Sequence, residues 1–427
     1  MTTATAVQSN DLQPSSSRPA EVRSVSPSPL VVFAGGGTGG HLYPALAVAE
    51  ALRQKIPRVR FLFFGTQRPI DQQVLGGGGD DHDKTNLALV QQDLPALARA
   101  PWRWPAIYNG FRVSSRLCRE RFTVERPVIV IGTGGLGSVP AVREASRMGI
   151  HTALLNPDAL PGRANRYLAR MSDTVFVQWE ETLAQFPASL RVLVTGCPVR
   201  SSFNRSTRED GLARFGLEES RKTLLIMGAS QGARTVNEAA VANLEFITGV
   251  DGWQMIHLTG HGEFEEVQLA YSRWGTGGAE RVKVLPYTDH LSQALAAADL
   301  VVARAGASSL AEITALGRAS ILMPYPHHKD LHQLANARCL VRASAARIVH
   351  DKIDSSVNGP ALRSVLEQLM SDGAGREAMA ASAKRLGRGQ AASRIADYVA
   401  DLPEVRAIHG RSSERFVAPS PGQSTPV

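Results

Sequence analysis

Two glycine-rich turns and one histidine are the groups in this sequence that could do chemistry. Residues 31–50, VVFAGGGTGGHLYPALAVAE, pass from an apolar run to five glycines around Thr38 and resume as a helical pattern at His41. A second turn of this kind, IGTGGLGSVP, occupies residues 131–140. Glycine lets backbone N–H groups approach a ligand closely, and a helix N-terminus behind the turn attracts phosphate. The turns favour an anion-binding site, although tight packing of strand on helix would explain either turn taken alone.

His41 stands where the first turn meets its helix. An imidazole is suited to remove a proton from a hydroxyl near neutral pH, and the positive end of a helix dipole disfavours its charged form. We expect His41 to act as a general base. The alternative is that it only orients a diphosphate or caps the loop.

Several familiar site types do not fit. The first turn matches G-x-G-x-x-G, but the strand expected at residues 59–65 is followed by Thr66, Gln67 and Arg68. The carboxylate that a dinucleotide site places there is missing. No glycine turn is followed by Lys and Ser or Thr, which argues against a P-loop, and there is no Gly-x-Ser-x-Gly elbow.

Two metal-like patterns are weak. Asp81 and Asp83 have Asp-x-Asp spacing but lie in GGGGDDHDK, which is typical of a solvated surface loop. His328 and His332 have i, i+4 spacing beside His327, without a nearby carboxylate or a third spaced ligand. We therefore expect no metal.

The elements that must position these groups repeat as strand, glycine turn and helix. Two such units precede residue 150 and two follow residue 220. Their strands are continuous apolar runs, as in parallel strands buried on both faces. This predicts an α/β protein with two doubly wound Rossmann-like domains, with a ligand cleft between the carboxyl ends of the two sheets. The polar segment at residues 196–211 marks the junction.

Composition bounds the class of protein. A chain of 427 residues with 43% hydrophobic residues suits two globular domains, and no apolar run approaches the length of a membrane span. Residues 1–28 predict a disordered leader, and residues 403–427 a disordered tail. Three widely spaced cysteines indicate a reducing, cytoplasmic location. The net charge of +8 is typical either of a surface that binds an anionic membrane or nucleic acid or of a solvated surface without such a partner.

Six segments occur in a fixed order: GGGTGGHLYPALAVAEAL, GTGGLGSVPA, NPDALPGRANRYLA, GCPVR, MGASQGARTVNE and ARAGASSLAEITALGRASILMPYPHHKDLHQLANA. They resemble the motifs of the MurG family of peptidoglycan glycosyltransferases, and the resemblance covers about residues 30–400. It implies the GT-B fold and inverting transfer of N-acetylglucosamine from UDP-GlcNAc to lipid I, without a metal or other cofactor. It also implies an acceptor and membrane-facing domain at 29–198 and a UDP-sugar domain at 199–402, whose last helix could pack back on the first domain.

The resemblance assigns donor-binding roles to the UDP-sugar domain. Glu312 would accept hydrogen bonds from the ribose hydroxyls, although Ser309 and Glu312 also fit a capping box. Arg200 would contact the donor, unless it forms an interdomain salt bridge, and the backbone of Thr288 would read the uracil edge. The other residues implied for UDP-GlcNAc are Thr38, Gly39, Gly40, Asp158, Ser230, Ala307, Ser308, Leu310, Ala311, His332 and Gln333.

Acceptor and membrane contacts are implied for the first domain. The glycines Gly36, Gly37, Gly134 and Gly135 would hold the acceptor diphosphate. Residues 102–122 mix aromatic and basic side chains that suit a lipid headgroup zone on the cytoplasmic side of the cell membrane rather than a nucleic acid. An amphipathic core helix would have the same pattern. The patch comprises Trp102, Trp104, Ile107, Phe111, Arg112 and Arg116.

Two positions depart from the family pattern. Asp158 stands where the family has an asparagine, and His332 stands where it has a glutamine. A carboxylate only accepts hydrogen bonds, so these changes bear on the donor sugar more than on UDP. The alternatives are a UDP-sugar transferase with another sugar or a lipid acceptor such as diacylglycerol, or an inactive nucleotide-binding homologue.

Overall fold

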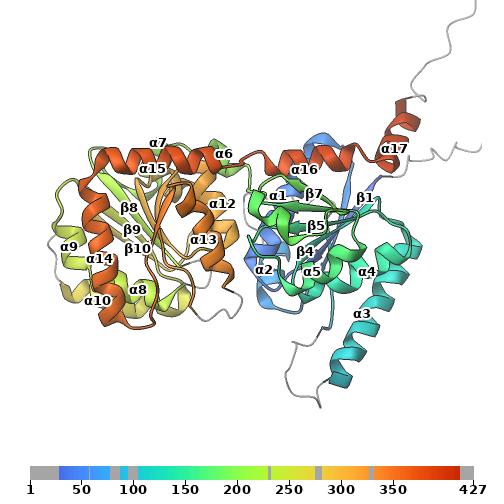
Figure 1. The fold of residues 1–427 in the computed structure, drawn as a ribbon, viewed down its shortest axis with the longest axis horizontal. Helices are drawn as coiled ribbons and strands as arrows, with labels where there is room; N and C mark the ends of the chain where they lie inside the picture. Colours follow the sequence, from blue (N-terminus) through green and yellow to red (C-terminus); the bar gives the residue numbers. More distant parts are fainter. Residues whose placement is uncertain are drawn as a thin grey trace, which may run out of the picture.

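The protein consists of two α/β lobes that lie side by side (Figure 1). The structure is a computed structural model, and it describes residues 28–56, 58–76, 87–94, 104–228, 232–274, 281–326 and 331–413. Each lobe is built on one parallel sheet. The GT-B expectation of two doubly wound sheets is confirmed.

The first lobe contains β1 (Leu30–Gly35), α1 (Gly39–Lys55), β2 (Arg60–Gly65), α2 (Pro69–Gly76), β3 (Leu87–Gln91), α3 (Trp104–Val124), β4 (Ile129–Gly134), α4 (Val139–Arg147), β5 (Thr152–Asn156), α5 (Arg163–Leu168), β6 (Thr174–Val177) and β7 (Arg191–Val194). Its strand order is β3-β2-β1-β4-β5-β6-β7. The order reverses between β1 and β4, which is where open α/β sheets bind ligands. Gly35 and Gly134 are register partners at this point, so the two glycine turns meet.

The second lobe contains α6 (Ser202–Arg205), α7 (Arg208–Phe215), β8 (Lys222–Met227), α8 (Arg234–Val241), α9 (Leu244–Gly249), β9 (Trp253–Leu258), α10 (Phe264–Trp274), β10 (Val282–Leu285), α11 (Leu291–Ala297), β11 (Leu300–Ala303), α12 (Ala307–Leu316), β12 (Ala319–Leu322), α13 (His332–Arg342), β13 (Ala346–Ile348), α14 (Ser355–Ser371) and α15 (Gly373–Leu386). Its strand order, β10-β9-β8-β11-β12-β13, reverses between β8 and β11.

The chain returns to the first lobe at its end (Figure 1). Helix α16 (Ala391–Ala400) packs on α1, and Asp397 pairs with Lys55 at the end of α1. The Tyr398 hydroxyl lies 2.8 Å from Nε2 of His151, the residue before β5. Helix α17 (Pro403–Ser413) follows, and Val405 is buried in the core of the first lobe. Helical structure therefore continues beyond the predicted start of the tail at residue 403.

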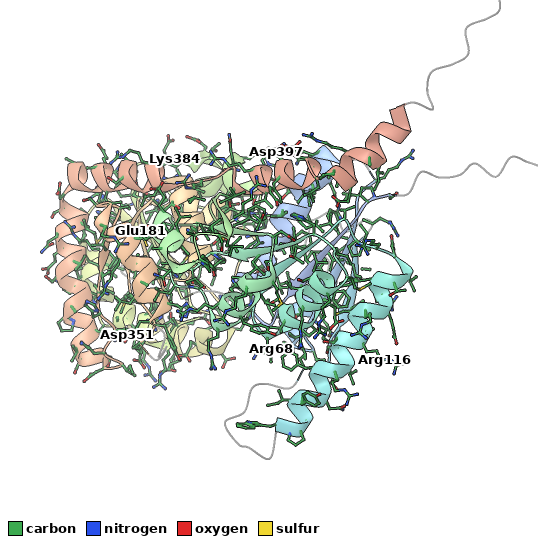
Figure 2. The ribbon with its side chains drawn as sticks, turned by 45° about the vertical axis from the view of Figure 1, so that its right-hand side comes forward. Arg68, Arg116, Glu181, Asp351, Lys384 and Asp397 are labelled. Atoms are coloured by element: carbon green, nitrogen blue, oxygen red, sulfur yellow. The ribbon has the colours of Figure 1, made fainter. Side chains whose placement is uncertain are left out.

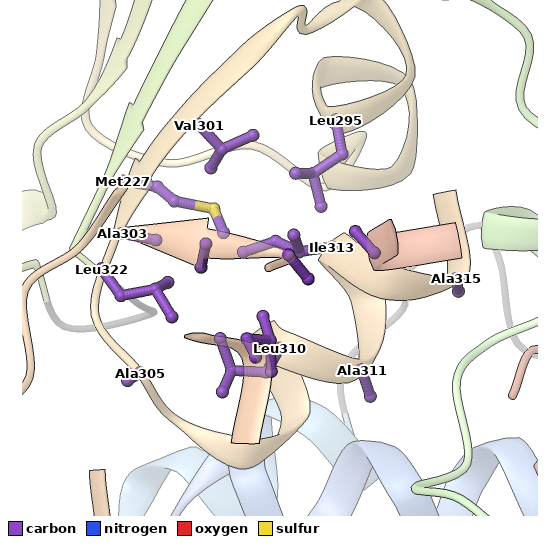
Figure 3. Close-up of a cluster of buried hydrophobic side chains, with 14 of the residues drawn as sticks. Met227, Leu295, Val301, Ala303, Ala305, Leu310, Ala311, Ile313, Ala315 and Leu322 are labelled. Atoms are coloured by element: carbon purple, nitrogen blue, oxygen red, sulfur yellow. The ribbon is translucent and has the colours of Figure 1, made fainter. Parts of the chain in front are cut away.

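Both sheets are buried on their two faces, as the continuous apolar strands predict. All six residues of β1 are buried, and separate apolar clusters cover the two faces of each sheet. One of these clusters holds α12 against β11, β12 and α11 through Leu310, Ile313 and Leu295 (Figure 3). This packing fixes α12 so that its N-terminus faces the first lobe.

Candidate donor and acceptor site

A cavity of about 650 Å³ lies between the two lobes. Its lining includes the first turn of α1, the turn after β4, the loop after β5, and the N-terminal turns of α12 and α13. Most of the residues implied for substrate binding meet here although they come from distant parts of the sequence: Thr38, Gly39, Gly40, His41, Gly134, Gly135, Asp158, Arg200, Thr288, Ala307, Ser308, Ser309, Glu312, His332 and Gln333.

The turn between β1 and α1 needs glycine for steric reasons. Gly36 and Gly37 have φ angles of 135° and 80°, which L side chains rarely adopt. A Cβ at Gly36 would overlap the carboxylate of Asp71. The Gly37 N–H donates to Asp71 Oδ1 at 2.7 Å, so this N–H does not serve as the predicted diphosphate donor. Gly36 and Gly37 shape the turn, and neither lines the cavity.

His41 is oriented by the same turn. Its Nδ1 lies 3.0 Å from the carbonyl oxygen of Gly36 and 3.3 Å from Thr38 Oγ1. A carbonyl oxygen only accepts hydrogen bonds, so the bond to Gly36 requires the proton on Nδ1. The Nε2 atom then holds a lone pair, and it faces Gly134, where an added Cβ would lie 3.1 Å away. His41 is thus set to accept a proton at Nε2.

The N-terminus of α12 faces that of α1 across the cavity. Neither helix has a side-chain cap or an acidic residue in its first turn within the described chain. The Ser308 hydroxyl donates to the Gly40 carbonyl oxygen at 3.3 Å. Two uncapped helix N-termini place partial positive charge on both sides of the cavity, which favours phosphate groups there.

Leu310 and Ala311 do not fit the donor-binding role that the resemblance implies. Both side chains belong to the apolar cluster under α12 (Figure 3). The N–H of Leu310 already bonds the Gly306 carbonyl oxygen at 3.0 Å. Only the first N–H groups of a helix lack an internal partner, so Ala307, Ser308 and Ser309 remain as the available donors.

Glu312 is a buried carboxyl group on the cavity wall. Its burial raises its pKa to about 7, and the positive charge of Arg200 opposes that rise. The capping-box alternative is wrong because α12 begins at Ala307, which places Ser309 inside the helix rather than at its N-cap. The carboxyl group of Glu312 makes no hydrogen bond to the rest of the described chain, so both its oxygens are available to a ligand hydroxyl.

Arg200 connects the two lobes without an ion pair in the described chain. Its guanidinium lies 5.0 Å from the ring of Tyr43, on α1, and 5.3 Å from that of Phe203. Its buried Nε has no hydrogen-bond partner among the described residues. The structure therefore does not contain the interdomain salt bridge that was the alternative for Arg200. The guanidinium lies near Glu312, and its Nε–H is available to donate a hydrogen bond to a ligand.

Three further predicted residues line the cavity, and each has a polar side-chain atom that is already hydrogen-bonded within the protein. Asp158 Oδ1 accepts from Asn336 Nδ2 at 2.8 Å, which ties the loop after β5 to α13. Gln333 Oε1 accepts from the Tyr325 N–H at 2.9 Å, leaving its amide nitrogen without a partner in the described chain. Thr288 Oγ1 accepts from the His290 N–H at 3.1 Å. His332 begins α13 on the same wall.

Some predicted residues lie outside the described residues: Trp102, Ser230, Asp81, Asp83, His327 and His328. Within the described ranges, no group of three or more histidine, cysteine or acidic side chains is arranged to hold a metal ion.

Sequence reasoning missed two residues that line the cavity and two that hold the glycine turn beside it. Tyr43 and Arg163 line it, and Arg68 donates to the Gly37 carbonyl oxygen at 3.0 Å. Asp71 is fully buried beneath the glycine turn. The sequence did contain a signal for Asp71, because an acidic residue follows the second strand. It lies six residues after Gly65, the last residue of that strand, and it contacts the glycine turn rather than a ligand.

Helix α3 carries the described part of the predicted membrane patch (Figure 2). Its buried residues are Ser114, Cys118 and Phe122, whereas Trp104 and Tyr108 are 61% and 66% exposed. Ile107 and Phe111 are half-buried, and Arg112 and Arg116 are exposed. The N-terminal half of α3 therefore projects beyond the lobe. This differs from the alternative of an amphipathic core helix, whose aromatic side chains would be buried. Within the described residues, no helix combines the length and apolar character needed to cross a bilayer.

The chain is similar to known glycosyltransferases over most of its length. Residues 31–177 match the Glycosyltransferase family 28 N-terminal domain, and residues 223–396 match the family's C-terminal domain. It is 36% identical over 375 residues to a protein of Halothermothrix orenii, named as a UDP-N-acetylglucosamine–N-acetylmuramyl-(pentapeptide) pyrophosphoryl-undecaprenol N-acetylglucosamine transferase. The match covers 87% of this chain and 98% of that protein.

A protein of the same name from Myxococcus xanthus is also 36% identical, with 87% of this chain and 92% of that protein covered. The crystal structure of Acinetobacter baumannii MurG has the same fold, with a TM-score of 0.67, 24% identity, and coverage of 87% of this chain and 99% of that one. The chain belongs to the MurG family of N-acetylglucosamine transferases, within glycosyltransferase family 28.

Proposed function

We propose that this chain transfers N-acetylglucosamine from UDP-GlcNAc to lipid I, the undecaprenyl-diphosphate-linked N-acetylmuramoyl-pentapeptide, and so forms lipid II. One observation carries the proposal for the site. Two uncapped helix N-termini from different lobes face each other, with His41 on the cavity wall beside them. Such a site suits a reaction between two diphosphate-bearing substrates.

The donor would lie against the second lobe. The N–H groups of Ala307, Ser308 and Ser309 would donate to its diphosphate, and Arg200 would add charge-assisted hydrogen bonds. Glu312, ionised, would accept from the ribose hydroxyls. The partial positive charge at the start of α12 would stabilise UDP as it leaves.

The acceptor would lie against the first lobe. Its diphosphate would meet Gly134 and Gly135 after β4. It would also meet Gly39 and Gly40 at the start of α1, which the resemblance assigns to UDP-GlcNAc; we assign them to the acceptor because Gly36 and Gly37 do not line the cavity. The sugar hydroxyl would then attack the anomeric carbon of the donor from the face opposite UDP. As the new C–O bond forms, the bond to the UDP oxygen breaks and the hydroxyl proton passes to His41 Nε2. One displacement inverts the anomeric centre.

The projecting half of α3 would bring this site to the membrane that holds the lipid acceptor. Ten residues of helix extend about 15 Å. Exposed Trp104 and Tyr108 would enter the headgroup zone while Arg112 and Arg116 meet anionic lipid. We infer peripheral binding at the cytoplasmic face of the bacterial cell membrane.

Transfer assays test the reaction. The purified chain is offered UDP-GlcNAc or UDP-glucose with a short-chain lipid I analogue or with diacylglycerol, in the presence of EDTA. Transfer from UDP-GlcNAc to the lipid I analogue alone is the expected result. Asp158 favours a second candidate, a transferase for another sugar, because a carboxylate lines the cavity near the donor. Transfer only from UDP-glucose would support that candidate and contradict the first.

Vesicle sedimentation tests the membrane contact. Trp104→Ala with Tyr108→Ala should reduce binding to anionic vesicles at least about fivefold, since the two exposed rings supply much of the apolar contact. Leu269→Ala with Arg273→Gln, an exposed pair on α10, is the matched control. Equal binding by both double variants and the wild type would rule out α3 as the membrane contact.

A further inference from the structure

Asp71 is a buried carboxylate beneath the glycine turn between β1 and α1. It lies in the first turn of α2 and is fully shielded from solvent. One oxygen, Oδ1, accepts from the Gly37 N–H at 2.7 Å. The other, Oδ2, accepts from the N–H and the hydroxyl of Thr66 at 2.6 Å and 2.9 Å. The carboxylate is thus held in one position by hydrogen bonds from two loops.

The Gly37 N–H and the Gly36 carbonyl are the two ends of one peptide unit. Asp71 holds the N–H end, and His41 Nδ1 lies 3.0 Å from the carbonyl oxygen at the other end. A hydrogen bond at one end of an amide strengthens the bond at the other, because each polarises the group between them. The carboxylate is therefore linked to the imidazole through a single peptide unit.

We propose that Asp71 is a positioning residue for His41 and acts through the peptide unit between Gly36 and Gly37. The inference rests on the proposed role of His41 as the base. Asp71 holds the Gly36 carbonyl toward Nδ1, which keeps the proton on Nδ1 and the lone pair on Nε2. It does not touch the substrates.

The need for such an anchor follows from the glycines. Glycine has access to both signs of φ, so the peptide unit between Gly36 and Gly37 has little intrinsic resistance to turning over. If it turned over, its N–H would face His41 Nδ1 in place of its carbonyl. Nδ1 would then accept, the proton would move to Nε2, and the imidazole could no longer take a proton from the acceptor. Only the orientation that Asp71 holds gives the catalytic tautomer.

Nitrogen-15 NMR of the histidine side chains measures this tautomer directly. The His41 signals are assigned by comparison with His41→Gln. In the wild type we expect Nδ1 to be protonated and Nε2 to be unprotonated at a pH where the ring is neutral. In Asp71→Asn, we expect a mixture of both tautomers. A wild-type ring protonated at Nε2 would overturn the proposal without any variant.

Kinetics separate positioning from general stability. Asp71→Asn should lower kcat roughly 10- to 100-fold and change KM for UDP-GlcNAc less than about twofold, because the donor is held by the second lobe. Glu144→Gln is the matched control, since Glu144 is equally buried in the first lobe but pairs with Arg119 and Arg147. It should lower stability and leave kcat within about twofold.

Asp71→Glu, which keeps the carboxylate, should recover the wild-type tautomer and most of kcat. The proposal fails if Asp71→Asn retains wild-type kcat, or if it loses kcat while the His41 signals stay unchanged. If His41→Ala has no effect on kcat, the proposed base is wrong. The NMR comparison of wild type and Asp71→Asn still decides whether the carboxylate sets the tautomer.

Discussion

The turn after β1 and the turn before α12 lie on opposite sides of the cavity. They differ in how many of their polar groups are already hydrogen-bonded within the protein. In the turn after β1, His41 binds the carbonyl of Gly36, Asp71 accepts from the Gly37 N–H, and Arg68 donates to the Gly37 carbonyl. In the turn before α12, a Cβ added at Gly306 would meet no atom within 4 Å, and the buried carboxyl group of Glu312 makes no hydrogen bond to the described chain. The first loop is organised before substrate binds, and the second leaves its donors and its acceptor for a ligand.

This difference matches the tasks of the two loops. A base must hold one tautomer and one direction in the absence of substrate, so internal hydrogen bonds are an advantage. A nucleotide site gains affinity only from groups that the protein has not already satisfied. The first loop should therefore be sensitive to changes in geometry, and the second to changes in ligand contacts and charge.

The largest effect should come from removing the base. His41→Ala should lower kcat roughly 100- to 10,000-fold, the range that general-base catalysis contributes. UDP-GlcNAc affinity, measured by calorimetry, should stay within about threefold because most of the proposed donor contacts belong to the other lobe. A loss of kcat below about tenfold would mean that His41 only orients the acceptor.

Adding one methyl group to a glycine should lower the unfolding free energy much more in the first loop than in the second. Gly36→Ala should cost about 2–4 kcal/mol of unfolding free energy, because its φ of 135° and the nearby Asp71 carboxylate both exclude a Cβ. Gly306→Ala, at a φ of −67° with open space around it, should cost less than about 1 kcal/mol. Urea unfolding measures both, and equal costs would remove the contrast.

Glu312 should make donor binding depend on pH. Its pKa is raised to about 7 by burial, so at pH 6 only about a tenth of the free protein carries the carboxylate that accepts from ribose. UDP-GlcNAc should bind about tenfold more tightly at pH 8 than at pH 6. Glu312→Gln should bind about 10- to 100-fold more weakly at pH 8 and lose this dependence. An unchanged pH profile in the variant would exclude Glu312 as the titrating group.

The same group links pH to stability with the opposite sign. A carboxyl whose pKa is raised by folding releases its proton at lower pH in the unfolded chain than in the native protein. The stability of the ligand-free protein should therefore fall as pH rises from about 4.5 to about 7. Thermal unfolding of Glu312→Gln should lack this part of the decrease.

The smallest effect should come from the hydrogen bond that joins the two loops. Ser308→Ala removes the bond from Ser308 Oγ to the Gly40 carbonyl oxygen, which is 3.3 Å long and partly open to solvent. We expect kcat/KM to fall about two- to fivefold and the unfolding free energy to change by less than about 1 kcal/mol. A loss above about twentyfold would show that lobe contact, rather than either loop alone, limits the reaction.

Much of the architecture was predictable because it follows from local pattern. Continuous apolar strands and glycine turns predict two parallel sheets with a ligand cleft between their carboxyl ends, and the ordered motifs identify the family. Positions deep in α12 were less predictable. The resemblance placed Leu310 and Ala311 at the donor, whereas helix geometry leaves only the first N–H groups free and turns these two side chains into the core.

The sequence by itself determined which groups carry the chemistry: a histidine at a glycine turn, a carboxyl group in a helix and an arginine at the junction. Tertiary structure alone decided their states. Burial raises the pKa of Glu312, the start of α12 at Ala307 removes the capping box, and the carboxylate of Asp71 reaches back under the turn to orient His41. Residue type and spacing encode what a side chain can donate or accept, but its burial and partners arise only when distant segments pack together.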